Sequence, residues 1–168
     1  MRRIPRAASK SRGVTLLELL IVLGLLAVLS ALAVPTFSQQ QAHWRQRAVA
    51  AQLMSAIWIA RGSALKTRGS SILCPSRSED CAGVYSQGFS VFDGEGRLVR
   101  AFPPRRGVSV HNRGGEPQAQ AVIWDSNGLA NRNMTFLLCS KGYAGNWSVV
   151  LNRVGRPRLV KDWGTCPG

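Results

Sequence analysis

Hydrophobic and polar residues divide the chain of 168 residues into one continuous apolar run, one helical stripe and a series of short strand-like segments. The apolar run extends from Val14 to Val34, and its polar members are Thr15, Glu18 and Ser30. A helix of about 20 apolar residues is long enough to cross the hydrocarbon core of a bilayer. The pattern therefore predicts a membrane-spanning helix near the N-terminus.

A helical pattern continues beyond this run. Val49, Leu53, Ile57 and Ala60 recur at spacings of three to four residues. This spacing places the four side chains along one face of an amphipathic helix. We predict one long helix from about residue 14 to 66, with its second half packed on a sheet.

The rest of the chain has the pattern of a β-rich domain, because short apolar runs are broken by Gly, Pro, Asn and Asp. Segments 89–92 and 97–102 flank a four-residue turn at Asp93–Gly96, which predicts a hairpin. Five further strands are expected at 108–111, 121–124, 134–139, 147–152 and 157–161. The predicted fold class is α+β, with a long N-terminal helix packed on a largely antiparallel β-sheet.

The chain is strongly basic, with 22 Lys and Arg against 8 Asp and Glu and a formal net charge of +14. Residues 1–13 hold five of the basic residues and no acid. Basic residues before a membrane span keep that end in the cytoplasm, so the rest of the chain is exported. Without these five, 17 Lys and Arg remain against the same 8 acids, a net charge of +9. This excess favours contact with a polyanion over acidic small-molecule chemistry.

All four cysteines lie in the exported part, where oxidation is permitted. They form no Cys-x-x-Cys pair, which argues against a zinc ribbon or a thioredoxin-type site. Of the three possible pairings we favour Cys74 with Cys81 and Cys139 with Cys166. Free cysteines in the core are the alternative.

Catalytic patterns are scarce. His43 and His111 are the only imidazoles, and the eight acids form no paired motif. The sequence has neither a Gly-x-Ser-x-Gly nucleophile elbow nor a phosphate-binding loop. We therefore expect a protein that is not an enzyme, with no catalytic residue, no metal ligand and no cofactor.

The start of the apolar run carries a motif. Gly13 is followed by Val-Thr-Leu-Leu-Glu-Leu-Leu, with a basic leader before it and the apolar run after it. This combination resembles the cleavage site of type IV pilins and type II secretion pseudopilins. In that family a membrane peptidase cuts after the glycine and methylates the new N-terminus. The resemblance implies cleavage between Gly13 and Val14, although Phe is commoner than Val at the first mature position.

An ordinary secretory signal is the alternative, with Ala31-Leu32-Ala33 as its cleavage site. The apolar run is longer than the usual 7 to 15 residues, and Glu18 places a carboxylate in its first turn, which is costly in lipid. In the pilin family Glu18 is the fifth residue of the mature chain. There it can be neutralised by the cationic N-terminal amine of a neighbouring subunit. In a plain signal anchor, Glu18 would simply lie at the membrane interface.

The resemblance implies three parts. These are a prepilin leader at 1–13, a transmembrane and assembly helix at 14–35, and an amphipathic helix plus β-rich periplasmic head at 36–168. The expected location is the inner membrane, crossed once, with assembly into a pilus or pseudopilus. The expected protein partners are the prepilin peptidase and other pilins in the filament.

The C-terminal segment 149–161 carries a second resemblance, to the pseudopilin H and FimT group of minor pilins. In the FimT branch, a Gly-Arg-x-Arg motif at this position is implicated in DNA binding during natural transformation. Gly155, Arg156 and Arg158 match this motif. In an extended segment, residues two apart point to the same side, so both arginines would face a phosphate backbone together.

Arg153 and Lys161 are the next DNA contacts we expect. The resulting hypothesis is a minor type IV pilin that binds extracellular DNA non-specifically, since phosphate contacts supply affinity without reading the bases. The alternative is a structural pseudopilin of a type II secretion system, or a pilus-priming subunit, without DNA binding. A second basic cluster either extends the DNA surface or is a solvated face; its members are Arg97, Arg100, Arg105, Arg106 and Arg113.

Overall fold

The computed structural model describes residues 13–77, 80–141 and 145–167, so the expected leader lies outside the described residues except for Gly13. The chain forms two compact units, Met1–Ser38 and Gln39–Gly168. We call the second unit the head. It contains the second half of the only helix longer than one turn in the described residues, α1, and all the described strands.

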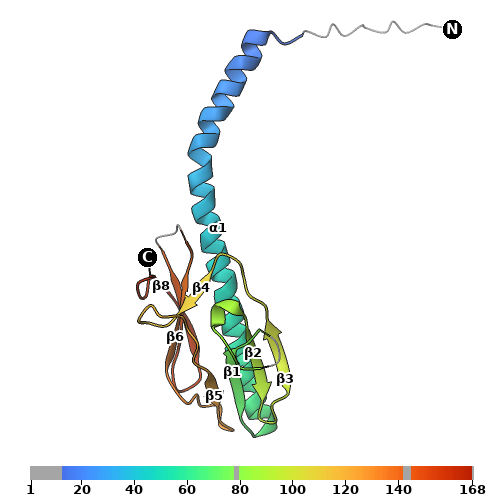
Figure 1. Cartoon of the computed structure of the whole chain (residues 1–168), viewed down its shortest axis with the longest axis vertical. Coiled ribbons are helices and arrows are strands. Elements are labelled where there is room, and N and C mark those ends of the chain that lie inside the picture. Colours follow the sequence, from blue (N-terminus) through green and yellow to red (C-terminus); the bar gives the residue numbers. More distant parts are fainter. Residues whose placement is uncertain (1–12, 78–79, 142–144, 168) are drawn as a thin grey trace, which may run out of the picture. The chain divides into compact units, whose positions relative to one another are not determined.

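Helix α1 runs without interruption from Leu16 to Thr67 and continues through Pro35 (Figure 1). Thr15 caps its start, because the Thr15 Oγ1 accepts a hydrogen bond of 3.2 Å from the backbone N–H of Glu18. The predicted helix is therefore confirmed, with ends within two residues of those expected.

The first unit is a helix with an apolar surface. Every large apolar side chain from Val14 to Leu29 is at least 49% exposed. In the described residues, Phe37–Thr67 is the stretch long and apolar enough to cross a membrane, with a mean hydropathy of 1.3, and Leu16–Ala31 is a shorter apolar stretch. Phe37–Thr67 owes much of its hydropathy to side chains buried in the head. Leu16–Ala31 is therefore the better match to the expected membrane helix.

The head contains two four-stranded antiparallel sheets rather than the single sheet we expected. The first has the order β3-β2-β1-β5 and the second the order β4-β6-β7-β8. The strands are β1 (Ser71–Pro75), β2 (Phe89–Asp93), β3 (Leu98–Phe102), β4 (Ser109–His111), β5 (Val122–Trp124), β6 (Met134–Cys139), β7 (Trp147–Leu151) and β8 (Pro157–Lys161). All of them except β1 lie where the sequence predicts a strand.

Strand β1 lies in the middle of the first sheet, where it pairs with both β2 and β5. Its five residues end at a proline, and the sequence analysis predicts no strand here. Pro75 is tolerated because it is the last residue of the strand, opposite Phe89. Pairing on both sides therefore makes a strand of a segment that the sequence analysis did not single out.

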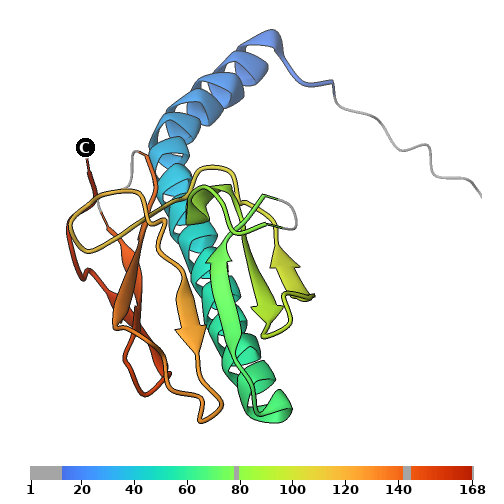
Figure 2. The same ribbon diagram turned by 60° about the horizontal axis from the view of Figure 1, so that its bottom comes forward.

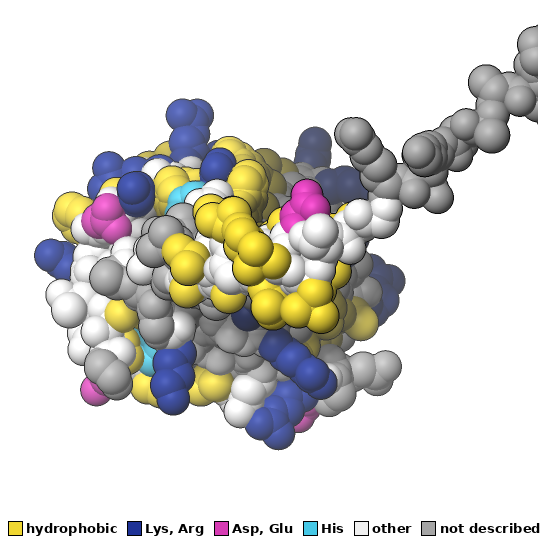
Figure 3. All heavy atoms as spheres, turned by 90° about the horizontal axis from the view of Figure 1, so that it is seen from above, with side chains coloured by type: hydrophobic (Ala, Val, Ile, Leu, Met, Phe, Trp, Pro, Cys, Tyr) yellow, Lys and Arg dark blue, Asp and Glu magenta, His cyan; other side chains and the backbone are white. Residues whose placement is uncertain are grey.

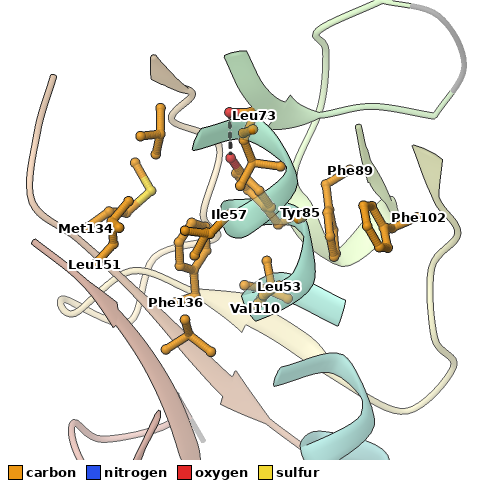
Figure 4. Close-up of a cluster of buried hydrophobic side chains, with 14 of the residues drawn as sticks. Leu53, Ile57, Leu73, Tyr85, Phe89, Phe102, Val110, Met134, Phe136 and Leu151 are labelled. Carbon is orange, nitrogen blue, oxygen red and sulfur yellow. Dashed lines mark hydrogen bonds between the residues drawn. The ribbon is translucent and has the colours of Figure 1, made fainter. Parts of the chain in front are cut away.

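One hydrophobic core joins α1 to both sheets, and Figure 2 shows both sheets beside the head portion of α1. Leu53 and Ile57 of the predicted helical stripe are fully buried. Tyr85 lies between the sheets: its hydroxyl donates a hydrogen bond of 3.0 Å to the carbonyl of Leu73 in β1, and its ring centroid lies 4.9 Å from that of Phe136 in β6 (Figure 4). Burial raises the pKa of Tyr85 above its usual value, so this phenol stays neutral.

Both favoured disulfides are present, Cys74–Cys81 and Cys139–Cys166, with Cα–Cα distances of 5.5 and 5.7 Å. The second one fixes the C-terminal segment to β6. This segment is also held to β7, because the Ser148 hydroxyl donates a hydrogen bond of 2.7 Å to the carbonyl of Trp163. Residues 163–166 therefore cover part of the outer face of the second sheet.

Candidate nucleic-acid interface

Strands β7 and β8 form the C-terminal hairpin, and β8 is an edge strand of the second sheet. Pro157, which has no N–H to donate to a neighbouring strand, begins β8 opposite Leu151. The hairpin turn is closed by a hydrogen bond of 2.9 Å from the N–H of Gly155 to the carbonyl of Asn152. The Gly-Arg-Pro-Arg motif therefore occupies the end of this turn and the start of an exposed edge.

Gly155 has a structural reason to be glycine. Its φ of +77° lies in the left-handed region, which side chains with a Cβ rarely adopt. A Cβ on Gly155 would also lie 2.5 Å from the carbonyl oxygen of Gly128 and 3.0 Å from the Nε1 of Trp124. Gly155 thus positions the motif and has no side chain with which to bind DNA.

Two asparagines support the turn that carries the arginines. The Asn152 Oδ1 accepts a hydrogen bond of 3.1 Å from the N–H of Arg156, and the Asn133 Oδ1 accepts one of 2.8 Å from the N–H of Arg153. The sequence analysis did not single out these asparagines. For Asn152, its place at the first position of a turn was the available signal, because an Asn side chain there commonly bonds the backbone a few residues further on. Asn133 bonds a residue 20 positions away, for which the local sequence has no signal.

The basic side chains of the hairpin do not all share one face. Arg158 lies opposite Val150, whereas Lys161 lies opposite Trp147. Because alternate residues of a strand point to opposite sides, Arg158 and Lys161 lie on opposite faces of β8. Arg156 is two residues before Arg158 and, like Arg153, is exposed. The structure thus separates Lys161 from Arg158, and it places Arg156 in the exposed turn before β8.

The second basic cluster is dispersed over the head. Arg97 is held in the β2–β3 turn by ion pairs of 2.8 Å to Asp93 and 2.9 Å to Glu95. Arg100 belongs to the edge strand β3 of the first sheet. Only Arg113 reaches the C-terminal segment, where its guanidinium carbon lies 5.4 Å from the centroid of the Trp163 ring. The cluster is therefore not one continuous patch.

A groove of about 400 Å³ lies on the second sheet beside the motif strand. Arg113, Asn133, Thr135 and Val150 are among the residues that line it. Arg158 lies next to this groove because Val150 is its partner in the strand register. The surface near the motif thus has one further arginine and several uncharged hydrogen-bonding groups.

The two C-terminal tryptophans differ in their surroundings. Trp147 is partly buried against the core, with the His43 ring centroid at 5.7 Å and the Arg47 guanidinium carbon at 5.4 Å. Trp163 is 39% exposed. Trp147 therefore packs α1 against β7, and only Trp163 has open surface.

At the N-terminal motif, Gly13 precedes α1, and a Cβ there would meet no atom within 4 Å among the described residues. The Glu18 side chain is exposed in the first turn of α1. In the described part of the chain, no group of three or more His, Cys, Asp or Glu residues is arranged to hold a metal ion.

A long N-terminal helix packed on antiparallel sheets defines the type IV pilin-like class of proteins. Within this class, the chain belongs to the GspH family, because the family model described as Type II transport protein GspH matches residues 49–155. The model of the prokaryotic N-terminal methylation motif matches residues 8–34. No curated protein matches the chain.

Two kinds of solved structure share the fold. One is the type IV minor pilin FimU of Pseudomonas aeruginosa, with a TM-score of 0.55, 18% identity, and coverage of 68% of this chain and 87% of that one. The other is the minor pseudopilin EpsH from the type 2 secretion system of Vibrio cholerae, with a TM-score of 0.51, 14% identity, and coverage of 69% and 96%. The resemblance to minor pilins and pseudopilins is thus confirmed. The DNA contacts stay a prediction.

Proposed function

We propose that this protein is a minor type IV pilin that binds extracellular DNA without sequence preference for uptake in natural transformation. The observation that carries the proposal is the exposed edge strand β8, with Arg156 and Arg158 held at its start by a hydrogen-bonded turn. An edge strand leaves one side of its backbone unpaired, so a long polyanion can approach it. The net charge of +9 that remains without residues 1–13 supports the same partner.

The expected mode of binding follows from the residue types. Arginine presents a planar fork of donors that fits phosphate oxygens. Phosphate contacts release counterions, so the logarithm of the affinity falls with the logarithm of the salt concentration, with a slope of about −0.9 per phosphate neutralised. The proposal gives Arg156 and Arg158 the principal contacts, with Arg153 beside them. Lys161, on the other face of β8, has a smaller role than the sequence predicts.

The proposal includes processing and location. A prepilin peptidase cuts between Gly13 and Val14, Leu16–Ala31 then lies in the inner membrane, and the head is periplasmic until the subunit joins a filament. The match to the methylation motif at residues 8–34 and the exposed apolar surface of Leu16–Ala31 support this course. Mass spectrometry of the mature protein tests it. A methylated Val14 at the N-terminus is expected, and an N-terminus at Val34 would show an ordinary signal peptide instead.

DNA binding is tested with the full mature chain in a neutral detergent, titrated with a short fluorescent duplex at several salt concentrations. Changing both Arg156→Gln and Arg158→Gln removes two charges and keeps the hydrogen-bonding length. Affinity should fall roughly tenfold, and the salt slope should become shallower by about 1.8. The matched control is Arg77→Gln with Arg100→Gln, which removes two exposed charges from β3 and from the segment just after β1 and should change both quantities less.

Two results would contradict this proposal. One is a wild-type protein that does not bind duplex DNA at low salt, and the other is equal loss of affinity in the motif variant and the control. In either case the protein is better described as a structural pseudopilin of a secretion system or a pilus-priming subunit. Transformation frequency in cells that carry the motif variant gives the same comparison in vivo.

A further inference from the structure

A second basic groove lies on the head away from the motif. It has a volume of about 670 Å³ and is lined by Gln41, Trp44, Arg45, Ala48, Arg105 and Arg106. The first four belong to α1, and the two others belong to the loop between β3 and β4. Three arginines and one tryptophan therefore meet where a loop of the head crosses the helix.

The groove is held together by close packing. Gly107 follows the two loop arginines and has a φ of +79°. A Cβ on Gly107 would lie 3.0 Å from the Nη1 of Arg45, so the guanidinium group of Arg45 lies against the backbone of the loop. This contact places Arg45 beside Arg105 and Arg106 although they are far apart in the sequence.

The charge of the groove is uncompensated. Arg45, Arg105 and Arg106 are exposed, and none of them forms an ion pair within the part of the chain that the structure describes. No acidic residue lines the groove. The face of the head drawn in Figure 3 likewise carries more Lys and Arg than Asp and Glu side chains. The groove is therefore suited to an anionic ligand.

The groove and the DNA motif lie at different ends of the head portion of α1. Arg45 contacts the groove loop, whereas the Cδ of Arg61 lies 3.3 Å from the position of a Cβ on Gly155. Sixteen residues of helix between Arg45 and Arg61 correspond to about 24 Å. A ligand in this groove is thus distinct from DNA bound at the motif.

We propose that this groove binds the headgroups of anionic phospholipids in the membrane that holds Leu16–Ala31. The inference rests on the membrane insertion given above, but not on DNA binding. In the lipid-bound state, the head is docked on the bilayer surface before the subunit enters a filament. Three arginines supply the attraction, and Trp44 supplies an amphipathic ring of the kind enriched at membrane interfaces.

Two observations favour lipid over nucleic acid. Trp44 is 58% exposed beside the arginines, although most apolar side chains of this part of α1 are packed in the core. The groove also begins soon after the membrane segment, since Gln41, its first lining residue along the chain, follows Ala31 by ten residues. This short connection lets the groove reach the bilayer surface, where the negative potential of anionic headgroups attracts basic residues.

The test uses the full mature chain in lipid nanodiscs made of phosphatidylcholine alone or with one third phosphatidylglycerol. Hydrogen–deuterium exchange is followed at the amides of residues 105–107. We expect exchange in the wild type to be slower in the anionic discs by roughly fivefold or more, because each basic residue near an anionic surface contributes about that factor. For each variant, the exchange rate in phosphatidylcholine discs is divided by the rate in anionic discs. Changes that a substitution makes to the intrinsic exchange rate of an amide therefore cancel.

The groove variant is Arg45→Gln, Arg105→Gln and Arg106→Gln, and the matched control is Arg100→Gln, Arg132→Gln and Lys141→Gln. Both remove three charges from exposed positions, and circular dichroism checks that both fold. We expect the ratio of the exchange rates in the two kinds of disc to fall toward one in the groove variant and to stay at the wild-type value in the control. Equal exchange in both kinds of disc, or an equal loss of protection in the two variants, would overturn it.

Two further measurements test the role of Trp44 and distinguish this lipid site from a nucleic-acid site. Trp44→Phe should reduce the protection without changing the charge, and unchanged protection would remove the role of the ring. Adding a short DNA duplex to phosphatidylcholine discs should leave residues 105–107 unprotected. Protection by the duplex and not by phosphatidylglycerol would show a nucleic-acid groove and overturn the lipid assignment. Incorporation into discs and the duplex titration report membrane insertion and DNA binding separately.

Discussion

Gly155 lies so close to Gly128 that a Cβ on Gly155 would be 2.5 Å from the Gly128 carbonyl oxygen. The same oxygen accepts a hydrogen bond of 3.2 Å from the Nε of Arg61 in α1. The β7–β8 turn therefore rests on the turn after β5, and that turn is bonded to the helix. Through these contacts, the core helix positions a turn whose arginines project into solvent.

Substitution of Gly155 by Ala should destabilise the head by about 3 kcal/mol or more, because strain at positive φ and overlap with a backbone carbonyl add together. Gly96→Ala is the matched control, since Gly96 has a φ of +78° and nothing within 4 Å of a Cβ. The control should lose about 1 kcal/mol. Thermal unfolding of the full chain in neutral detergent measures both. Equal losses would show that the contact with Gly128 is not limiting.

Glu18 should be required for assembly through its carboxylate. The Glu18→Gln variant keeps the backbone N–H that Thr15 caps, so α1 should start at the same residue. It cannot form an ion pair with the N-terminal amine of a neighbour, and its incorporation into filaments should fall while its membrane insertion stays normal. Immunoblots of sheared filaments and of membranes measure the two quantities. Wild-type incorporation of Glu18→Gln would remove the proposed role of the charge.

The two disulfides should differ in their contribution to stability. Cys139 and Cys166 are 27 residues apart, whereas Cys74 and Cys81 are 7 apart. Loop-closure entropy predicts a loss of about 3.5 kcal/mol for replacing the first pair by alanines and about 2.5 kcal/mol for the second. Removal of the first pair also frees the segment that covers Leu137. Denaturant unfolding of the two double variants checks the order, and a larger loss from the shorter loop would contradict it.

Asp93 should make the free energy of unfolding of the head depend on pH in the acid range. The hydrogen bond from the Arg97 side chain, followed by those from the backbone N–H groups of Arg97 and Glu95, holds the pKa of Asp93 below its usual value. Because the pKa of Asp93 is lower in the folded state, its charge stabilises the fold at any pH above the unfolded-state pKa of about 3.9. This stabilisation is lost as the pH falls through the folded-state pKa.

The difference in melting temperature between the wild type and Asp93→Asn should therefore shrink as the pH is lowered from 6 to 2. The substituted amide keeps the size of the side chain but does not titrate, so the variant isolates the charge. The effect should be small because this turn is exposed and its Arg97 ion pair is screened by solvent. A difference that stays constant over this pH range would exclude a contribution from the Asp93 charge.

The elements that the sequence predicts well are those with a long or regular local signal. Helix α1 has an apolar run followed by a stripe at helical spacing, and its observed ends match the prediction closely. The β2–β3 hairpin has a turn sequence between two apolar segments, and its Asp93–Gly96 turn is observed. Strand β1 ends at a proline and lies in no predicted segment, and its pairing with β2 and β5 establishes it.

The candidate DNA-binding site likewise has some features with a local sequence signal and others that only the tertiary structure shows. The spacing of Arg156 and Arg158 is local; Arg158 lies in the edge strand β8, and Arg156 lies in the turn before it. The position of Lys161 depends on the strand register, and the dispersal of the Arg97 to Arg113 cluster depends on the path of three loops and two sheets. Arg45 joins Arg105 and Arg106 through a contact between segments about 60 residues apart, for which the local pattern has no signal.

By itself, the sequence determined the membrane-type N-terminal run, the cleavage motif, the long helix, the number of cysteines and the basic charge, because each of these is a property of neighbouring residues or of composition. Only the tertiary structure decided that there are two sheets, which basic residues share a surface, and why Gly155 must lack a side chain. These depend on contacts between segments that are distant along the chain, and such contacts are set by the packing of the whole core around α1.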